Sequence, residues 1–186
     1  MWRRPSVAWL ALTALTALTA LACDDTTHAT VAPFLEPCVA PYVDEGLCFR
    51  ITDDGQPSRQ IHRGLLYFSF EWGVTQRIRY TDPRDDEVLN CAPDSTECHR
   101  VVDADVATRL PAGTPFTLEF RSTEASHAWL RPGSHGLALR GYDVEATAEV
   151  SAAAIELDAM PLAYRIDVEL TGDHAVPLRA VAAAPL

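Results

Sequence analysis

The chain has 186 residues, of which 26 are acidic and 15 are basic, so its formal net charge at pH 7 is −11. This length suits one domain with a full hydrophobic core and is short for two. Nucleic acid is excluded as an expected partner because phosphate binding needs a basic surface, and the complete lack of lysine excludes phosphate loops of the glycine-lysine type.

The first 23 residues have the composition of an export signal. Two arginines precede an uncharged hydrophobic run over 7–22, which is too short to span a bilayer comfortably and is followed by Cys23 and two aspartates. This segment resembles bacterial lipoprotein signal peptides, in which the cysteine thiol is acylated and the preceding segment is removed. The resemblance implies a signal peptide over 1–22, a palmitate-type lipid on Cys23, and a lipid-anchored protein of the bacterial cell envelope that faces the periplasm or the cell exterior. An ordinary secretory signal cut elsewhere is the alternative.

The segment after the cysteine has no hydrophobic period. Residues 23–37 are therefore expected to form a flexible tether that lifts the domain off the membrane. The domain itself is expected over residues 38–186, where strand patterns begin.

Four further cysteines, Cys38, Cys48, Cys91 and Cys98, lie in this domain. An even number in an exported chain predicts two disulfides, and we favour the local pairs Cys38–Cys48 and Cys91–Cys98 over the other two possible connectivities. A four-thiolate zinc site is the alternative, but such sites usually bring their cysteines in closer pairs than these.

Alternation of apolar and polar residues predicts most of the secondary structure. A period of two buries one face of a strand, which a helix with this pattern could not do. The expected strands are 47–52, a nearly apolar central strand at 66–72, then 77–80, 116–121, 142–150 and 164–170, with a last strand that frays from Ala180.

Helix is expected to be scarce. Residues 103–110 could make two helical turns, and 122–130 a short helix or an irregular crossover. Residues 151–160 are ambiguous because their alanines favour helix while Ile155 and Leu157 alternate with acidic residues, and we favour strand. The predicted fold is thus all-β: a single antiparallel β-sandwich of the immunoglobulin-like or jelly-roll-like kind, with little helix.

The sequence carries no recognisable catalytic motif, so we expect no catalytic residue and no cofactor. The Gly133–Gly136 segment lacks the spacing of a nucleophile elbow, and the six histidines lack the spacing of a metal site. The best metal candidates are the carboxylates of Asp82, Asp85, Asp86 and Glu87, because calcium prefers several carboxylates from one irregular loop. A solvated turn is the more ordinary interpretation of the same residues.

One tryptophan is a candidate for a binding surface. Trp72 fits the apolar pattern of 66–72 and is expected in the core, whereas Trp129 adjoins the turn at 131–133 and is the candidate for stacking on a glycan or a protein partner. The expected function is a lipid-anchored envelope protein with a non-catalytic binding or structural module. An envelope carbohydrate-active hydrolase and a calcium-dependent binding module remain the alternatives.

Overall fold

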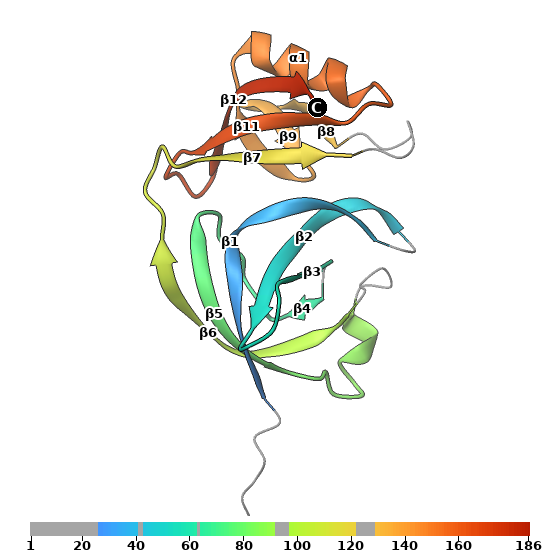
Figure 1. The fold of residues 1–186 in the computed structure, drawn as a ribbon, viewed down its shortest axis with the longest axis vertical. Coiled ribbons are helices and arrows are strands. Elements are labelled where there is room, and N and C mark those ends of the chain that lie inside the picture. The colour runs from blue at the N-terminus through green and yellow to red at the C-terminus, as the bar shows by residue number, and fades with distance from the viewer. Residues whose placement is uncertain (1–25, 41–42, 63, 92–96, 122–128) are drawn as a thin grey trace, which may run out of the picture.

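The structure is a computed structural model that describes residues 26–40, 43–62, 64–91, 97–121 and 129–186. These residues form two β-sheets of six strands each and the helix α1 (Ala148–Asp158) (Figure 1). The first sheet has the order β3-β2-β1-β5-β6-β4 and contains β1 (Thr27–Ala40), β2 (Val43–Asp53), β3 (Arg59–Ile61), β4 (Leu65–Leu66), β5 (Val74–Thr81) and β6 (His99–Arg109). The second has the order β7-β11-β12-β10-β9-β8 and contains β7 (Pro115–Phe120), β8 (Leu130–Gly133), β9 (Gly136–Leu139), β10 (Tyr142–Glu145), β11 (Tyr164–Leu170) and β12 (Leu178–Pro185).

This arrangement confirms the prediction of a mostly β, sandwich-like fold. The first sheet uses only residues 27–109 and the second only 115–185, so the chain passes from one sheet to the other once, at 110–114. Most strand pairs are antiparallel, but β4 pairs with β6 and β10 pairs with β12 in parallel. The two sheets therefore follow one another along the chain.

The first sheet curls around a small core of its own. Six flat strands would place its edges β3 and β4 about 24 Å apart, yet Ile61 and Leu65 are joined by four peptide units, which span at most about 14 Å. The sheet must therefore bend until its edges approach each other, as Figure 1 shows. The curled face encloses the buried residues Ala29, Val31, Ile51, Ile61, Leu65, Ile78, Tyr80 and Val101.

The second core lies between the second sheet and α1, and the first half of the chain contributes to it. The ring of Phe120 stacks on that of Tyr164 with centroids 4.7 Å apart and meets the edge of Trp129 at 5.4 Å. Leu35 and Trp72 reach this core from the first half of the chain. These shared residues hold the two sheets together.

The predicted tether is wrong from Thr27 onward. Residues 27–40 form β1, a central strand of the first sheet between β2 and β5, with Ala29 and Val31 fully in the core. Its register shifts between Val31 and Leu35, around Pro33, so the alternation is interrupted there. A bulge of this kind moves side chains to the opposite face, which hides the period from a sequence reading.

The predicted strand at 142–150 ends at Glu145, and 148–158 is a helix rather than the strand favoured for 151–160. Thr147 caps the helix by accepting a hydrogen bond from the backbone N–H of Val150 at 3.3 Å. Ala154 is completely buried. Val150, Ala154 and Leu157 follow the helical spacing i, i+4, i+7 and pack on the second core, so the alanine preference prevails.

Two further predictions of secondary structure are wrong, and a third lies mostly outside the described residues. Residues 103–110 belong to strand β6 down to Arg109 and do not form helical turns. The central strand expected over 66–72 is limited to β4, and the chain then runs irregularly past Tyr67, which has a positive φ of 62°. Most of the 122–130 crossover lies outside the described residues.

No helix in the described part of the chain has the length and hydrophobicity to cross a membrane.

Candidate functional site

A cleft of about 710 Å³ opens where the chain passes between the two sheets, and we call it the junction cleft. Four segments that are distant in sequence line it: 69–72 before β5, 109–112 after β6, 141–143 at the start of β10, and the β11–β12 connection within 170–177. Such a position between two packed layers is a common one for ligand sites.

Aromatic side chains form one wall of the junction cleft. The ring of Trp72 meets Phe70 at 5.4 Å and Tyr142 at 5.4 Å, both edge to face, and it lies 6.1 Å from Phe116 in a stacked geometry. Phe116 in turn stacks on Phe34 at 3.9 Å. This chain of rings joins the two sheets and fixes the orientation of the wall.

Two hydrogen-bonding groups on this wall lack partners. The indole N–H of Trp72 is buried and has no hydrogen-bond partner within the described structure. The hydroxyl of Tyr142, which is half-buried, likewise accepts and donates no hydrogen bond among those residues. Burial raises the pKa of the Tyr142 phenol, so this hydroxyl stays protonated and is available as a donor.

The lining of the junction cleft also carries charged groups. Arg109 contacts both carboxylate oxygens of Glu71, with Nη2 to Oε2 at 3.1 Å, and Nδ1 of His174 lies 3.1 Å from Glu71 Oε1. The Arg109 hydrogen bonds lower the pKa of Glu71 against a smaller opposing effect of burial, and the charges of Arg109 and His174 lower it further. Glu71 is therefore firmly ionised, which is the opposite of what a general acid requires.

Two aspartates complete the polar lining. Asp143 accepts a hydrogen bond from Ser134 Oγ at 2.8 Å, and Asp173 accepts one from the backbone N–H of Ala175 at 2.8 Å. Each side chain is thus oriented by a short local contact. With Glu71 they place three carboxylates and one arginine among the described residues that line the cleft.

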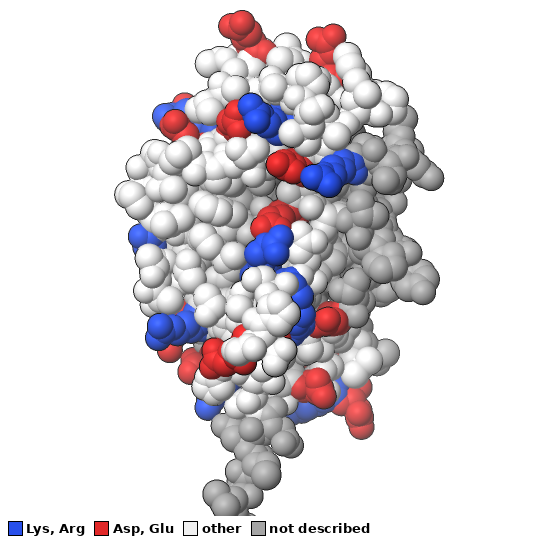
Figure 2. All heavy atoms as spheres, in the orientation of Figure 1, with Lys and Arg blue, Asp and Glu red and all other residues white. Residues whose placement is uncertain are grey.

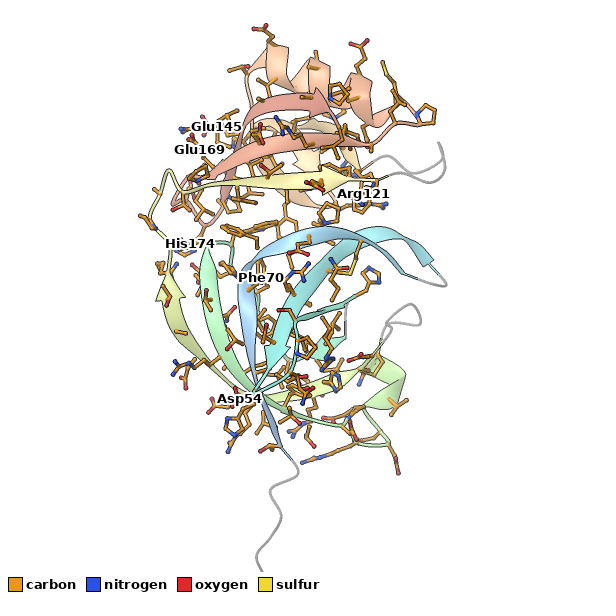
Figure 3. The ribbon with its side chains drawn as sticks, in the orientation of Figure 1. Asp54, Phe70, Arg121, Glu145, Glu169 and His174 are labelled. Atoms are coloured by element: carbon orange, nitrogen blue, oxygen red, sulfur yellow. A yellow bond between two sulfur atoms is a disulfide. The ribbon has the colours of Figure 1, made fainter. Side chains whose placement is uncertain are left out.

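A second cleft of about 610 Å³ lies between β1–β2 and β7. Its central group is Glu36, which accepts hydrogen bonds from Arg50 Nε at 2.6 Å and from Gln60 Nε2 at 2.8 Å. Arg121, labelled at the end of β7 in Figure 3, also lines this cleft; it is 78% exposed and lies 3.3 Å from Glu119. The ionic groups here largely satisfy one another, so this cleft is a weaker site than the junction cleft.

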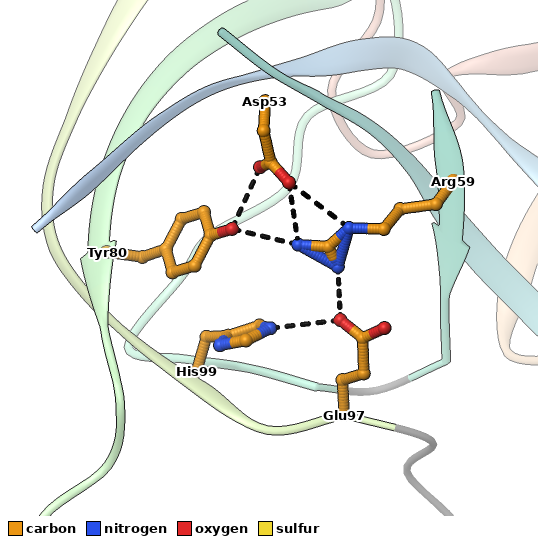
Figure 4. Close-up of polar contacts among 5 residues, drawn as sticks. All are labelled: Asp53, Arg59, Tyr80, Glu97 and His99. Carbon is orange, nitrogen blue, oxygen red and sulfur yellow. Dashed lines mark hydrogen bonds and ion pairs between the residues drawn. The ribbon is translucent and has the colours of Figure 1, made fainter. Parts of the chain in front are cut away.

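The most connected polar cluster lies at the other end of the first sheet (Figure 4). Arg59 donates to Asp53 Oδ2 at 3.2 Å and to the Tyr80 hydroxyl at 2.8 Å, and that hydroxyl donates to Asp53 Oδ1 at 2.8 Å. Arg59 also pairs with Glu97, whose carboxylate lies 3.1 Å from His99 Nε2. Because the charges are paired and Tyr80 belongs to the core, we interpret this cluster as a polar cover over the first core.

The disulfides are confirmed as the predicted local pairs, Cys38–Cys48 and Cys91–Cys98. Cys23, the predicted lipid attachment residue, lies outside the described residues. The prediction that Trp129 forms an exposed stacking surface is wrong: the ring borders the second cleft described above but is only 2% exposed, and it packs in the second core under the guanidinium of Arg140.

The four calcium candidates do not converge. Glu87 is buried: its carboxylate accepts the backbone N–H of Arg84 at 2.9 Å and pairs with Arg100 at 3.0 Å. It is therefore turned away from Asp82, Asp85 and Asp86, which are exposed. In the described part of the chain no group of three or more histidine, cysteine, aspartate or glutamate side chains is placed to hold a metal ion.

Sequence reasoning missed the junction cleft. Its residues come from four segments with no shared motif, and Trp72 was expected only as a core residue.

On the face shown in Figure 2, arginines lie beside carboxylates and do not gather into a basic patch. No protein family, curated protein or solved structure matches this chain.

Proposed function

We propose that this chain is a lipid-anchored protein of the bacterial cell envelope whose sandwich-like domain is a non-catalytic module that binds a glycan in the junction cleft. The anchor is supported by the residues up to Cys23. The two disulfides fit an oxidising compartment outside the cytoplasm.

The observation that carries the binding proposal is the pairing of an aromatic wall with a polar rim in one cleft. A sugar ring has an apolar face of C–H groups that packs on aromatic rings, and hydroxyls that hydrogen-bond to carboxylates and guanidinium groups. The half-buried rings of Phe70 and Tyr142 supply the first kind of contact, with the buried Trp72 ring packed against both, and the charged groups of Glu71, Arg109 and Asp143 supply the second. Since carboxylates outnumber arginine in the lining, a neutral glycan fits better than an acidic one.

A hydrolase in the same cleft is less well supported. Glycoside hydrolysis needs one carboxyl group that keeps its proton near neutral pH, and the pKa of Glu71 is moved in the wrong direction. We therefore propose binding without bond cleavage.

Titration of the chain from Cys23 onward with oligosaccharides tests the site, using tryptophan fluorescence as the readout. The probes are the N-acetylglucosamine tetramer and maltotetraose as neutral glycans and tetragalacturonate as an acidic one. A neutral probe should bind, and Arg109→Ala should weaken it by about tenfold, the equivalent of one hydrogen bond to a charged group. Arg121→Ala in the second cleft is the matched control, expected to leave binding unchanged. Binding of none of the three probes, or an equal loss in both variants, would reject the junction cleft as a glycan site.

The anchor is tested separately by growing cells with a palmitate analogue. Wild-type protein should incorporate the label and sediment with membranes, and Cys23→Ser should do neither. Equal labelling of both proteins would reject lipidation at Cys23.

A further inference from the structure

The beginning of β1 determines which end of the fold lies nearest to the proposed lipid. Thr27 is only four residues after Cys23, and four peptide units span at most about 14 Å whatever path they take. Thr27 pairs with Tyr80 of β5, and Ala29 pairs with Asp53 of β2, so this strand end is fixed within the first sheet. This end of the first sheet is therefore held within about 14 Å of a lipid attached to Cys23.

The junction cleft lies at the opposite end of the same strands. β5 begins at Val74, two residues after Trp72 of the cleft wall, and its Tyr80 pairs with Thr27. At about 3.3 Å per residue, β5 separates the cleft from the Thr27 end by about 20 Å. Figure 1 shows the second sheet and α1 at the end of the molecule away from the start of β1.

Charge keeps the Thr27 end of the domain from entering the headgroup layer. The exposed side chains of Asp54, Asp82, Asp85 and Asp86 belong to the turn after β2 and to the loop after β5, next to the start of β1. The backbone N–H of Asp54 donates to the carbonyl of His28 at 3.1 Å, which places that turn beside Thr27. These four carboxylates outnumber the exposed Arg84 of the same loop, so this end is repelled by anionic headgroups.

We propose that the Thr27 end of the first sheet faces the bilayer, that α1 is the outermost element, and that the junction cleft opens about 20 Å or more above the lipid surface. This inference rests on the proposed lipid anchor. The headgroup layer of a bilayer is only about 5–8 Å thick on each side. The cleft is thus out of reach of lipid headgroups, and its ligand is a glycan chain that extends away from the membrane or one that is not attached to it.

The absence of lysine makes this orientation measurable, because one introduced lysine gives a unique side-chain amine for a fluorescent donor. Asp54→Lys places it at the Thr27 end, and Glu156→Lys places it on α1; both positions are exposed and both variants change the charge equally. The chain from Cys23 onward is coupled through that cysteine to a maleimide lipid in phosphatidylcholine vesicles that carry an acceptor on their headgroups. The unsubstituted chain, labelled in the same way, measures the signal from the terminal amine.

Energy transfer to the bilayer should be several-fold stronger from residue 54 than from residue 156, and adding anionic phosphatidylglycerol should preserve that order. Equal transfer from the two positions, or stronger transfer from residue 156, would overturn the orientation. Chemical coupling keeps this test independent of lipidation in the cell. Failure of palmitate labelling would reject the anchor, whereas failure of the energy-transfer order with the lipid attached would reject only the orientation.

Discussion

Asp158, the last residue of α1, should be one of the most sensitive polar positions in the domain. Its carboxylate accepts the backbone N–H of Trp129 at 3.2 Å, the backbone N–H of Leu130 at 2.9 Å and the hydroxyl of Tyr164 at 2.6 Å. The three donor residues are all at most 4% exposed, so water cannot readily replace the lost acceptor. The single side chain thereby joins α1 to the start of β8 and the start of β11.

Replacement of Asp158 by alanine leaves these three donors without their acceptor. A buried donor left unsatisfied costs about 1–3 kcal/mol, and because such losses are not additive, we expect a total of about 3–5 kcal/mol. That is a large fraction of the roughly 5–15 kcal/mol that stabilises a typical domain. Asp158→Asn keeps the shape and one acceptor oxygen, so its cost should be smaller, about 1–3 kcal/mol.

Urea unfolding of the chain from Cys23 onward, with disulfides intact, measures both values. Glu156→Ala is the matched control, because Glu156 is exposed on the same helix and its replacement should change stability by no more than about 0.5 kcal/mol. If Asp158→Ala is no more destabilising than Glu156→Ala, the proposed role of this carboxylate as a shared acceptor is incorrect.

Three further predictions concern covalent links, backbone packing and charge. Reduction of the two disulfides should cost about 2.5 kcal/mol each in the chain-entropy description without abolishing the fold, measured by urea unfolding with and without reductant. Gly64→Ala should destabilise the domain by several kcal/mol, because a Cβ at this position would clash with the backbone carbonyl oxygen of Glu97. Gly113→Ala is the control: its Cβ would meet no atom within 4 Å, so it should cost only about 1 kcal/mol for the positive φ. Glu71 has a folded-state pKa below its ordinary value of 4.5, so its stabilising pair with Arg109 is present above that pH and is lost as pH falls through the folded pKa. Glu71→Gln should therefore lower stability at pH 7 and flatten the acid limb of the stability curve, and an unchanged acid limb would contradict this assignment.

The sequence by itself determined the features that depend on near neighbours. The strands at 47–52, 116–120 and 164–170 follow from strict alternation, because their apolar faces pack on the cores and the register shifts beside them insert the extra residues in β1 and β12. The disulfides pair cysteines 10 and 7 residues apart, and such short loops close easily. These elements and cross-links were sufficient to indicate a disulfide-linked, mostly β fold.

Tertiary structure decided everything that depends on distant partners. β1 is a strand because β2 and β5 pair with it on both sides, despite the register shift around Pro33. The 148–158 segment is a helix because Thr147 caps it and the second core receives Ala154, whereas its alternation alone favoured a strand. The burial of Trp129 and the assembly of the junction cleft both depend on packing between segments that are far apart in the chain. No local pattern records such packing, because it is set by which surfaces meet after the sheets have formed.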